Sequence, residues 1–323
     1  MRIEIYKTFE IPDDLWPEIT EGFNESFDLH STVTEFRKSF SVRNKLGYGF
    51  HAVAFADNGE VAGFHTQSPT FYKGGLNVIV AGSSYVRKKY RQDIFIFYEM
   101  SRRLAEYCHG EGFSVKVGVP NHNSYDYSIK ILKSIYVGNL DYYILPFRLS
   151  TCLHKPSLKI FDWLVFLMAR LHVCFQLFLS TCFNHREKVV KYELETTPEY
   201  FVHRFPSPYK KYDNGDIVAY YRMYDEDGAK TAYLFDCREN GVRTSKAVAA
   251  AAAYIAGKER PDAILFVGWL RLIQHTLFKV PERFVPKKLP LTYYVLDKGD
   301  KQKYDDMRNR DNWNFSLMNF DVR

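Results

Sequence analysis

The feature of this sequence that most restricts its fold is a single order of expected elements, strand–strand–helix–strand–helix–strand, which occurs twice along the chain. In the first half, two apolar runs at 50–56 and 61–67 flank an Asp-Asn-Gly turn, which suits a hairpin. In the second half, the runs at 217–224 and 230–236 flank Asp-Glu-Asp-Gly in the same way. Short apolar strands that alternate with helices are typical of mixed α/β sheets.

The other expected elements complete two units of this kind. The first unit adds helices at 12–29, 94–109 and 125–133 and strands at 76–81, 115–119 and 141–147. The second adds a short helix opened by Thr197, helices at 245–256 and 269–278, and strands at 263–267 and 291–296. We expect the strand at 141–147 to close the first unit and the strand at 291–296 to close the second.

The length of 323 residues accommodates two such units. We therefore predict an α/β fold with mixed sheets (α+β), divided into an N-terminal domain over 1–150, a connecting segment over 151–190 and a C-terminal domain over 191–323. The aromatic tail at 311–323 is expected to pack on the body of the protein.

The connecting segment contains an apolar stretch, residues 158–183, that is almost long enough to cross a bilayer. Asp162, Arg170, His172 and Gln176 interrupt it, and a charge in mid-membrane is costly. On a helical wheel these polar residues share one arc, so the stretch is predicted to be an amphipathic helix. A helix packed on its own protein is the leading interpretation; a helix lying on a membrane surface and a true span stay open.

Charge and cysteine content narrow the function classes. The net charge of +6 is a mild excess, which permits an anionic ligand without arguing for nucleic acid. The five cysteines form no Cys-x-x-Cys pair, so neither a disulfide framework nor a metal site is expected. The chain begins without an apolar leader, and we expect a cytoplasmic protein whose membrane contact, if it has any, is peripheral and made through 158–183.

Two short segments have the composition of a binding site. A basic turn, VRKKYRQ at 86–92, directly precedes the helix expected from residue 94. Unpaired N–H groups and the dipole at a helix N-terminus attract anions, and arginines in the turn add charge, although a solvated basic turn is the plainer interpretation. The second segment, Pro-Asn-His-Asn-Ser at 120–124, follows the strand at 115–119.

The order of these elements resembles the GNAT acyltransferase superfamily. The elements are the Asp-Asn-Gly hairpin, the strand at 76–81, the basic turn entering a helix, and the Pro-Asn-x-x-Ser segment with the helix and strand after it. The similarity covers residues 50–147, and the stretch from 115 to 145 looks like bacterial members associated with capsules and polysaccharides. Residues 191–323 look like a second, degenerate lobe. The resemblance thus implies two tandem GNAT-like lobes joined by the amphipathic helix.

The resemblance also implies an activity and a set of site residues. It implies an acyl-CoA-dependent N-acetyltransferase that moves an acetyl group from acetyl-CoA directly to an amine, on an amino sugar or polysaccharide precursor. The backbone of Gly82, Ser83 and Ser84 would face the thioester carbonyl. The cofactor contacts would come from Arg87, Arg91, Gln92, Asn121, Asn123 and Ser124. Either Ser124 or Asn123 also suits a helix cap.

Two departures from the family pattern keep other interpretations open. The turn from 87 to 94 has no glycine where small residues would let the backbone approach a pyrophosphate. The position of the family's acidic Tyr falls near Lys130, so Tyr125 and Tyr127 are the substitute acids and His65 the candidate base. The alternatives are a GNAT-fold binding or scaffold protein that no longer catalyses, and a Fem-type aminoacyl-tRNA-dependent transferase, for which tRNA would be a partner.

Overall fold

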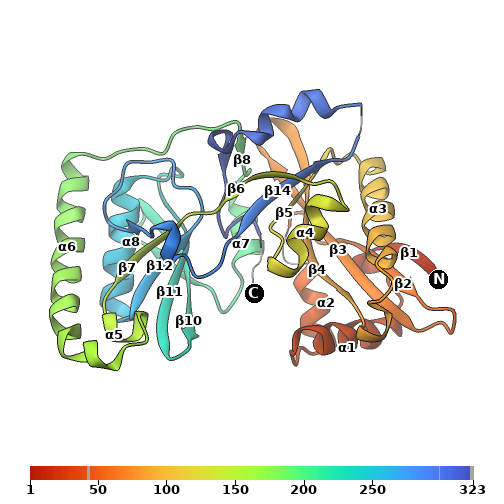
Figure 1. Ribbon diagram of the computed structural model, residues 1–323. Helices are drawn as coiled ribbons and strands as arrows, with labels where there is room; N and C mark the ends of the chain where they lie inside the picture. The colour runs from red at the N-terminus through yellow and green to blue at the C-terminus, as the bar shows by residue number, and fades with distance from the viewer. Residues whose placement is uncertain (42–43, 298, 321–323) are drawn as a thin grey trace.

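The computed structural model describes residues 1–41, 44–297 and 299–320. The described residues form two large sheets with helices on their faces, arranged side by side (Figure 1), and one small two-stranded sheet. The mixed α/β class and the two-lobed arrangement expected from the sequence are confirmed.

The first lobe is a seven-stranded sheet in the order β1-β2-β3-β4-β5-β14-β6. Its strands are β1 (Arg2–Lys7), β2 (Phe50–Phe55), β3 (Val61–Tyr72), β4 (Leu76–Val86), β5 (Val115–Gly118), β14 (Pro290–Val295) and β6 (Ile135–Asn139). Helices α1 (Leu15–Phe27) and α2 (Val33–Ser41) bury one face of this sheet, and α3 (Phe95–Gly110) buries the other. The alternation along β2 explains the two layers, because Val53 faces α1 and α2 whereas Ala52 faces α3. The short helix α4 (His122–Lys130) follows β5.

The second lobe is a six-stranded sheet in the order β13-β7-β12-β11-β10-β9. Its strands are β13 (Phe278–Lys279), β7 (Tyr142–Pro146), β12 (Ala263–Val267), β11 (Ala229–Glu239), β10 (Ile217–Glu226) and β9 (Lys210–Asp213). Its helices are α5 (Leu149–Cys152), α6 (Asp162–Cys182), α7 (Pro198–Arg204) and α8 (Ser245–Lys258). The connecting helix α6 packs along α8, and Ala169, Val173 and Ser180 are buried on its inner side. The helix is therefore packed on its own protein, which was the leading interpretation from the sequence.

The two sheets exchange one strand each. The strand expected to close the first unit, β7, instead pairs with β12 in the second sheet. The strand expected to close the second unit, β14, lies between β5 and β6 in the first sheet. Both expectations were wrong because a short apolar run shows that a strand is buried but not which distant strand it pairs with.

The helix expected at 269–278 is also absent from the structure. The described residues 270–277 form a loop, in which the side-chain amide of Gln274 accepts from the N–H of Leu277 (2.9 Å) and donates to its C=O (3.0 Å). This side chain takes over backbone bonds that a helix would have used, which is a common effect of polar side chains in loops.

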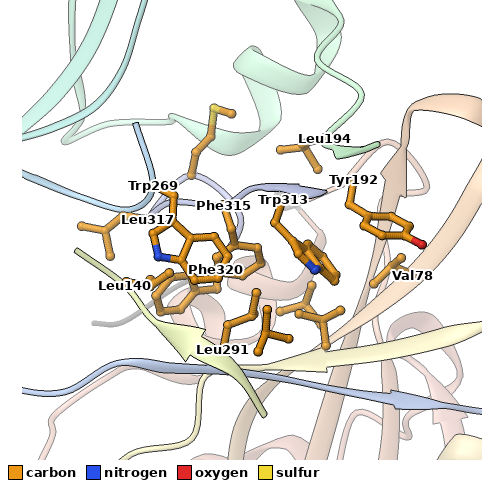
Figure 2. Packing of buried hydrophobic residues seen from close by; sticks show 14 of the residues in the cluster. Val78, Leu140, Tyr192, Leu194, Trp269, Leu291, Trp313, Phe315, Leu317 and Phe320 are labelled. Carbon is orange, nitrogen blue, oxygen red and sulfur yellow. The ribbon is translucent and has the colours of Figure 1, made fainter. Parts of the chain in front are cut away.

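A shared core joins the lobes (Figure 2). Val78 and Leu291 of the first sheet and Trp269 after the second belong to one buried cluster with Trp313 and Phe315 of the C-terminal tail. The expected docking of this tail is confirmed for 311–320, and the last three residues lie outside the described part of the chain. Two parallel strands, β8 (Tyr192–Glu193) and β15 (Trp313–Asn314), fix the tail beside the linker. The lobes are therefore held by one continuous hydrophobic cluster.

Candidate functional site

The candidate site begins where two central strands separate. β4 and β5 run parallel and pair from Val78–Val115 to Val80–Val117, but no further. β4 continues to Val86, whereas the chain after Gly118 turns away towards α4. The β5-side edge of β4 beyond Val80 therefore has no partner strand there, and its backbone groups stay available to a ligand.

A cleft of about 970 Å³ opens from this gap. Its walls include side chains of both halves of the chain, among them Phe23 of α1, Phe97 of α3, Arg204 of α7 and Phe320 of the tail. The two lobes therefore share one cleft.

Most of the candidate residues from the sequence come together in this cleft. It is lined by His65, Gly82, Ser83, Ser84, Arg91, Asn121, Asn123, Ser124 and Tyr127. Arg87, Gln92 and Tyr125 do not line it. Among the described residues, no group of three or more His, Cys, Asp or Glu could hold a metal ion.

His65, the candidate base, is part of a buried hydrogen-bond relay. Its Nδ1 lies 2.6 Å from Oγ of Ser84, which in turn donates to the C=O of Gly82 (2.8 Å). On the other side, the Gln67 amide donates to Nε2 of His65 (3.2 Å). Burial and the charge of Lys116 lower the pKa of His65 well below its usual value, so the ring is neutral. With both nitrogens occupied, His65 holds the end of β4 in place and has no free lone pair to act as a base.

A further group in the cleft, Lys116, was missed from the sequence. It lies in the middle of β5, is about 8% exposed, and donates to Oγ of Ser101 on α3 (2.7 Å). Among the described residues no carboxylate lies within ion-pair distance of it, and burial lowers its pKa to about 8. The available signal was a lysine inside Val-Lys-Val, because a central parallel strand is normally apolar on both faces.

The two candidate tyrosines differ in their surroundings. Tyr127 on α4 donates its hydroxyl to the C=O of Ile94 (2.8 Å), at the start of α3, and burial raises its pKa to about 12. Tyr125 packs edge-on against Tyr136 and lies outside the cleft. Tyr127 is therefore the better placed of the two, although its proton is already donated to a carbonyl.

Asn121 has a structural task within the site. Its side chain accepts from the N–H of Ser124 (3.0 Å) and caps α4. The cap was expected at Ser124 or Asn123, and that expectation was wrong because the helix begins earlier, at His122.

Arg87, the first arginine of the basic turn, is directed away from the cleft. It donates to a carboxylate oxygen of Glu21 (3.0 Å) on α1 and to the C=O of Glu18 (3.0 Å), and it lies 3.6 Å from the carboxylate of Glu60. An arginine that α1 and Glu60 already neutralise is not available to phosphates, so the structure contradicts its expected role. Arg91 does line the cleft, and its Nε donates to the C=O of Val86 (2.7 Å).

The turn itself is closed by its own hydrogen bonds. The N–H groups of Tyr90, Arg91 and Asp93 donate to carbonyls within the turn. The carboxylate of Asp93 then accepts from the N–H of Phe95 (2.9 Å) and lines the cleft. A carboxylate thus occupies the start of α3, where an open turn would hold a pyrophosphate.

Comparison with known proteins supports the fold. The sequence matches no family model and no curated protein. The structure is similar to GCN5-related N-acetyltransferases from Anabaena variabilis (TM-score 0.57, 9% identity, 92% of this chain and 73% of that chain) and Kribbella flavida (0.57, 11%, 92% and 71%). It is also similar to a probable N-acyltransferase from Enterococcus faecalis (0.55, 10%, 92% and 73%). At identities this low, structural similarity establishes the fold alone. Because the alignments cover 92% of the chain, they include both lobes, and the chain has the fold of the GCN5-related N-acetyltransferases.

Proposed function

We propose that this protein is an N-acyltransferase that takes an acyl thioester in the gap between β4 and β5 and passes the acyl group directly to an amine. The single observation that carries the proposal is the gap itself, where β4 loses its partner strand beyond Val80 beside a cleft of about 970 Å³. An extended thioester arm can pair with such an edge, because the edge keeps unpaired backbone donors and acceptors.

The residues of the cleft suit the chemistry of this transfer. The amine nitrogen forms a bond to the acyl carbon, the C–S bond breaks, the amine loses a proton and the leaving thiolate gains one. Backbone N–H groups from 82–84 would polarise the thioester carbonyl. The pKa of Lys116, about 8, is close to the ordinary pKa of a thiol, about 8.5. We therefore assign Lys116 as the proton donor to the leaving thiolate.

Acetyl-CoA is the donor we expect, bound mainly through its pantetheine arm. The turn before α3 has tied up its N–H groups and carries Asp93, which opposes a pyrophosphate. Arg91 is the cation of the turn that lines the cleft. We therefore expect CoA to bind weakly for this fold, with little difference between CoA and pantetheine.

An amino sugar is the acceptor class that the outer cleft favours. Its wall combines hydroxyl side chains, such as Ser68 and Ser83, with the aromatic rings of Phe27 and Phe71. Sugars are commonly held by such polar groups together with an aromatic face.

Calorimetry with acetyl-CoA and desulfo-CoA, followed by a thiol-release assay with a panel of amino sugars, tests the proposal. We expect binding of both ligands and thiol release that depends on the amine. An absence of binding at millimolar ligand would reject the acyl-CoA donor.

A second candidate function, a binding module without catalysis, is favoured by the occupied turn at Asp93. In that case an amino sugar would bind in the absence of CoA, and acetyl-CoA would release no thiol when the amino sugar is added. The tRNA-dependent alternative predicts instead a gel shift with aminoacyl-tRNA that persists at physiological salt.

A further inference from the structure

The connecting helix α6 differs from an ordinary surface helix because its largest apolar side chains are exposed. It forms the outer edge of the second lobe (Figure 1) and rests on the lobe through small buried residues, Ala169, Val173 and Ser180, and through several polar side chains. Arg170 donates to a carbonyl at the end of α8 (3.2 Å), Nε2 of His172 lies 3.0 Å from the backbone C=O of His275, and Asp162 accepts from the N–H of Ser150 (3.0 Å). In a water-soluble protein the apolar face of a helix normally points inwards.

The outward face of this segment, which we call the α6 face, is apolar along its whole length. Its large side chains are between 39% and 70% exposed. They are Ile160, Phe161, Trp163, Leu164, Leu167, Met168, Leu171, Phe175, Phe178 and Phe183. A continuous exposed stripe of this kind is rare on a monomeric protein and marks a contact surface.

We propose that the α6 face docks the protein onto a lipid bilayer that contains anionic lipids, with the helix lying in the plane of the interface. The segment Pro156–Cys182 is long and apolar enough to cross a membrane. Its polar side is bonded to α8 and the neighbouring loop, so the helix stays attached to the lobe and exposes one face to the lipid. Because α6 is the outermost element of its lobe, a flat surface can reach the whole stripe (Figure 1).

The charges at the two ends of the α6 face argue for lipid as the occupant. Lys155 and Lys159 precede the helix, and Arg186 and Lys188 follow it; all four are exposed. In the described part of the chain, none of the four has a carboxylate within ion-pair distance. Such cations attract anionic headgroups, each strengthening binding roughly fivefold.

A second copy of the chain fits this surface less well. In a two-fold dimer through α6, either a parallel or an antiparallel arrangement brings the cations at one helix end against cations of the other copy. The acids within the segment cannot relieve this, since Asp162 binds Ser150 and Glu187 is buried against Arg243. The bilayer supplies the negative charge that a second copy lacks.

Tryptophan fluorescence of the purified full-length chain gives a direct test. Trp163 is 68% exposed, whereas Trp16, Trp269 and Trp313 are buried. Vesicles of phosphatidylcholine and phosphatidylserine should shift the emission to the blue and float the protein in a gradient. The Trp163→Phe variant should still float but lose the shift. No flotation and no shift would overturn the proposal.

Matched variants distinguish binding through the α6 face from non-specific adsorption to vesicles. The double variant Met168→Gln, Leu171→Gln replaces two exposed apolar side chains of the α6 face. It should lower partitioning onto vesicles at least tenfold, because two apolar side chains would no longer be buried in the lipid. The control, Val202→Gln with Phe284→Gln, changes exposed apolar residues elsewhere and should leave it unchanged. Unaltered thermal unfolding shows that both pairs fold, and equal partitioning of the two pairs would overturn the proposal.

Charge and oligomer measurements complete the test. Lys155→Gln with Lys159→Gln should weaken binding to phosphatidylserine vesicles and leave any binding to pure phosphatidylcholine as it was. Light scattering should show a monomer in solution. A dimer that the Met168→Gln, Leu171→Gln pair dissociates, in a protein that ignores vesicles, would assign the α6 face to a second copy instead.

Discussion

The parallel pair β4–β5 with its helix α3 and the parallel pair β11–β12 with its helix α8 share one topology but have different contents. Both pairs run parallel for three residue pairs. At the middle pair the first lobe has Lys116 beneath Ser101 of α3, whereas the second has Ile264, fully buried against the alanines of α8. The same scaffold thus has a polar cavity wall in one lobe and a closed apolar core in the other.

The turn before α3 borders the cleft, whereas the turn before α8 is covered by the chain itself. Before α8, Arg243 is buried and bonded to Asp236 (2.7 Å) and Glu187 (2.9 Å). The chain around Asn184 also covers the first turn of α8, where its Oδ1 accepts from the N–H of Lys246 (3.2 Å). Before α3, the turn faces the cleft. The comparison teaches that in the second lobe the chain itself covers the start of the helix, whereas in the first lobe the corresponding position borders the cleft.

The largest effect we expect from testing this comparison is on stability. Arg243→Met leaves the buried carboxylate of Glu187 without its cation and leaves Asp236 with Arg238 alone, so it should lower the free energy of unfolding by about 3–5 kcal/mol. Arg87→Met should cost only about 1 kcal/mol, because the carboxylate of Glu21 is largely exposed and returns to water. Urea unfolding of both variants measures the contrast, and equal losses would contradict it.

Replacing Lys116, at the middle residue pair of β4 and β5, should affect activity rather than stability. Lys116→Met should reduce thiol release by about a hundredfold, because it removes the proton donor for the thiolate, while the protein stays folded. Lys130→Met changes a lysine that is exposed on α4 and should leave the rate unchanged. Full activity of Lys116→Met would show that another group supplies the proton.

The lowered pKa of Lys116, about 8, also makes stability depend on pH. Between this value and the usual 10.5, the folded protein has released a proton that the unfolded chain still holds, so the free energy of unfolding rises with pH. Between pH 7 and pH 10 the gain relative to Lys116→Met should be about 2 kcal/mol. Guanidinium unfolding at the two pH values tests the sign, and a constant difference between the proteins would contradict it.

How far the sequence predicted this molecule depends on the range of the interactions involved. The two hairpins, the starts of α3 and α8 and the docking of the tail follow from local pattern, and they were found close to where they were expected. The exchange of β7 and β14 was missed, because sheet partners are chosen by contacts far apart in sequence.

The same limit applies within the site. The local motifs at 82–84 and 121–124 point to residues that do line the cleft, namely Gly82, Ser83, Ser84, Asn121, Asn123 and Ser124. Arg87 was misjudged because its partners on α1 lie more than sixty residues away. Val-Lys-Val marks Lys116 as an unusual lysine in a buried strand, but Lys116 was missed because the pattern does not show the cavity beside it.

The smallest effect concerns the helix caps, which also differ between the lobes. α8 is capped by the uncharged hydroxyl of Thr244, which accepts from Ala247 N–H (3.1 Å), whereas α3 begins with the carboxylate of Asp93. Asp93→Asn keeps an oxygen for the N–H of Phe95 but removes the negative charge beside the expected phosphates. We expect affinity for CoA to rise roughly fivefold, the usual size of one charge at a helix end.

Calorimetry with CoA and with pantetheine isolates this effect, because pantetheine has no pyrophosphate. The gain in Asp93→Asn should appear for CoA and not for pantetheine, and should shrink as salt is added. Asp126→Asn on α4 removes a carboxylate that is paired with Lys130 and does not line the cleft, and should change neither affinity. An equal gain for both ligands would mean that the turn moved rather than lost a charge. No gain for either would place the phosphates away from α3, and the first lobe would then resemble the second in having a helix start that binds nothing.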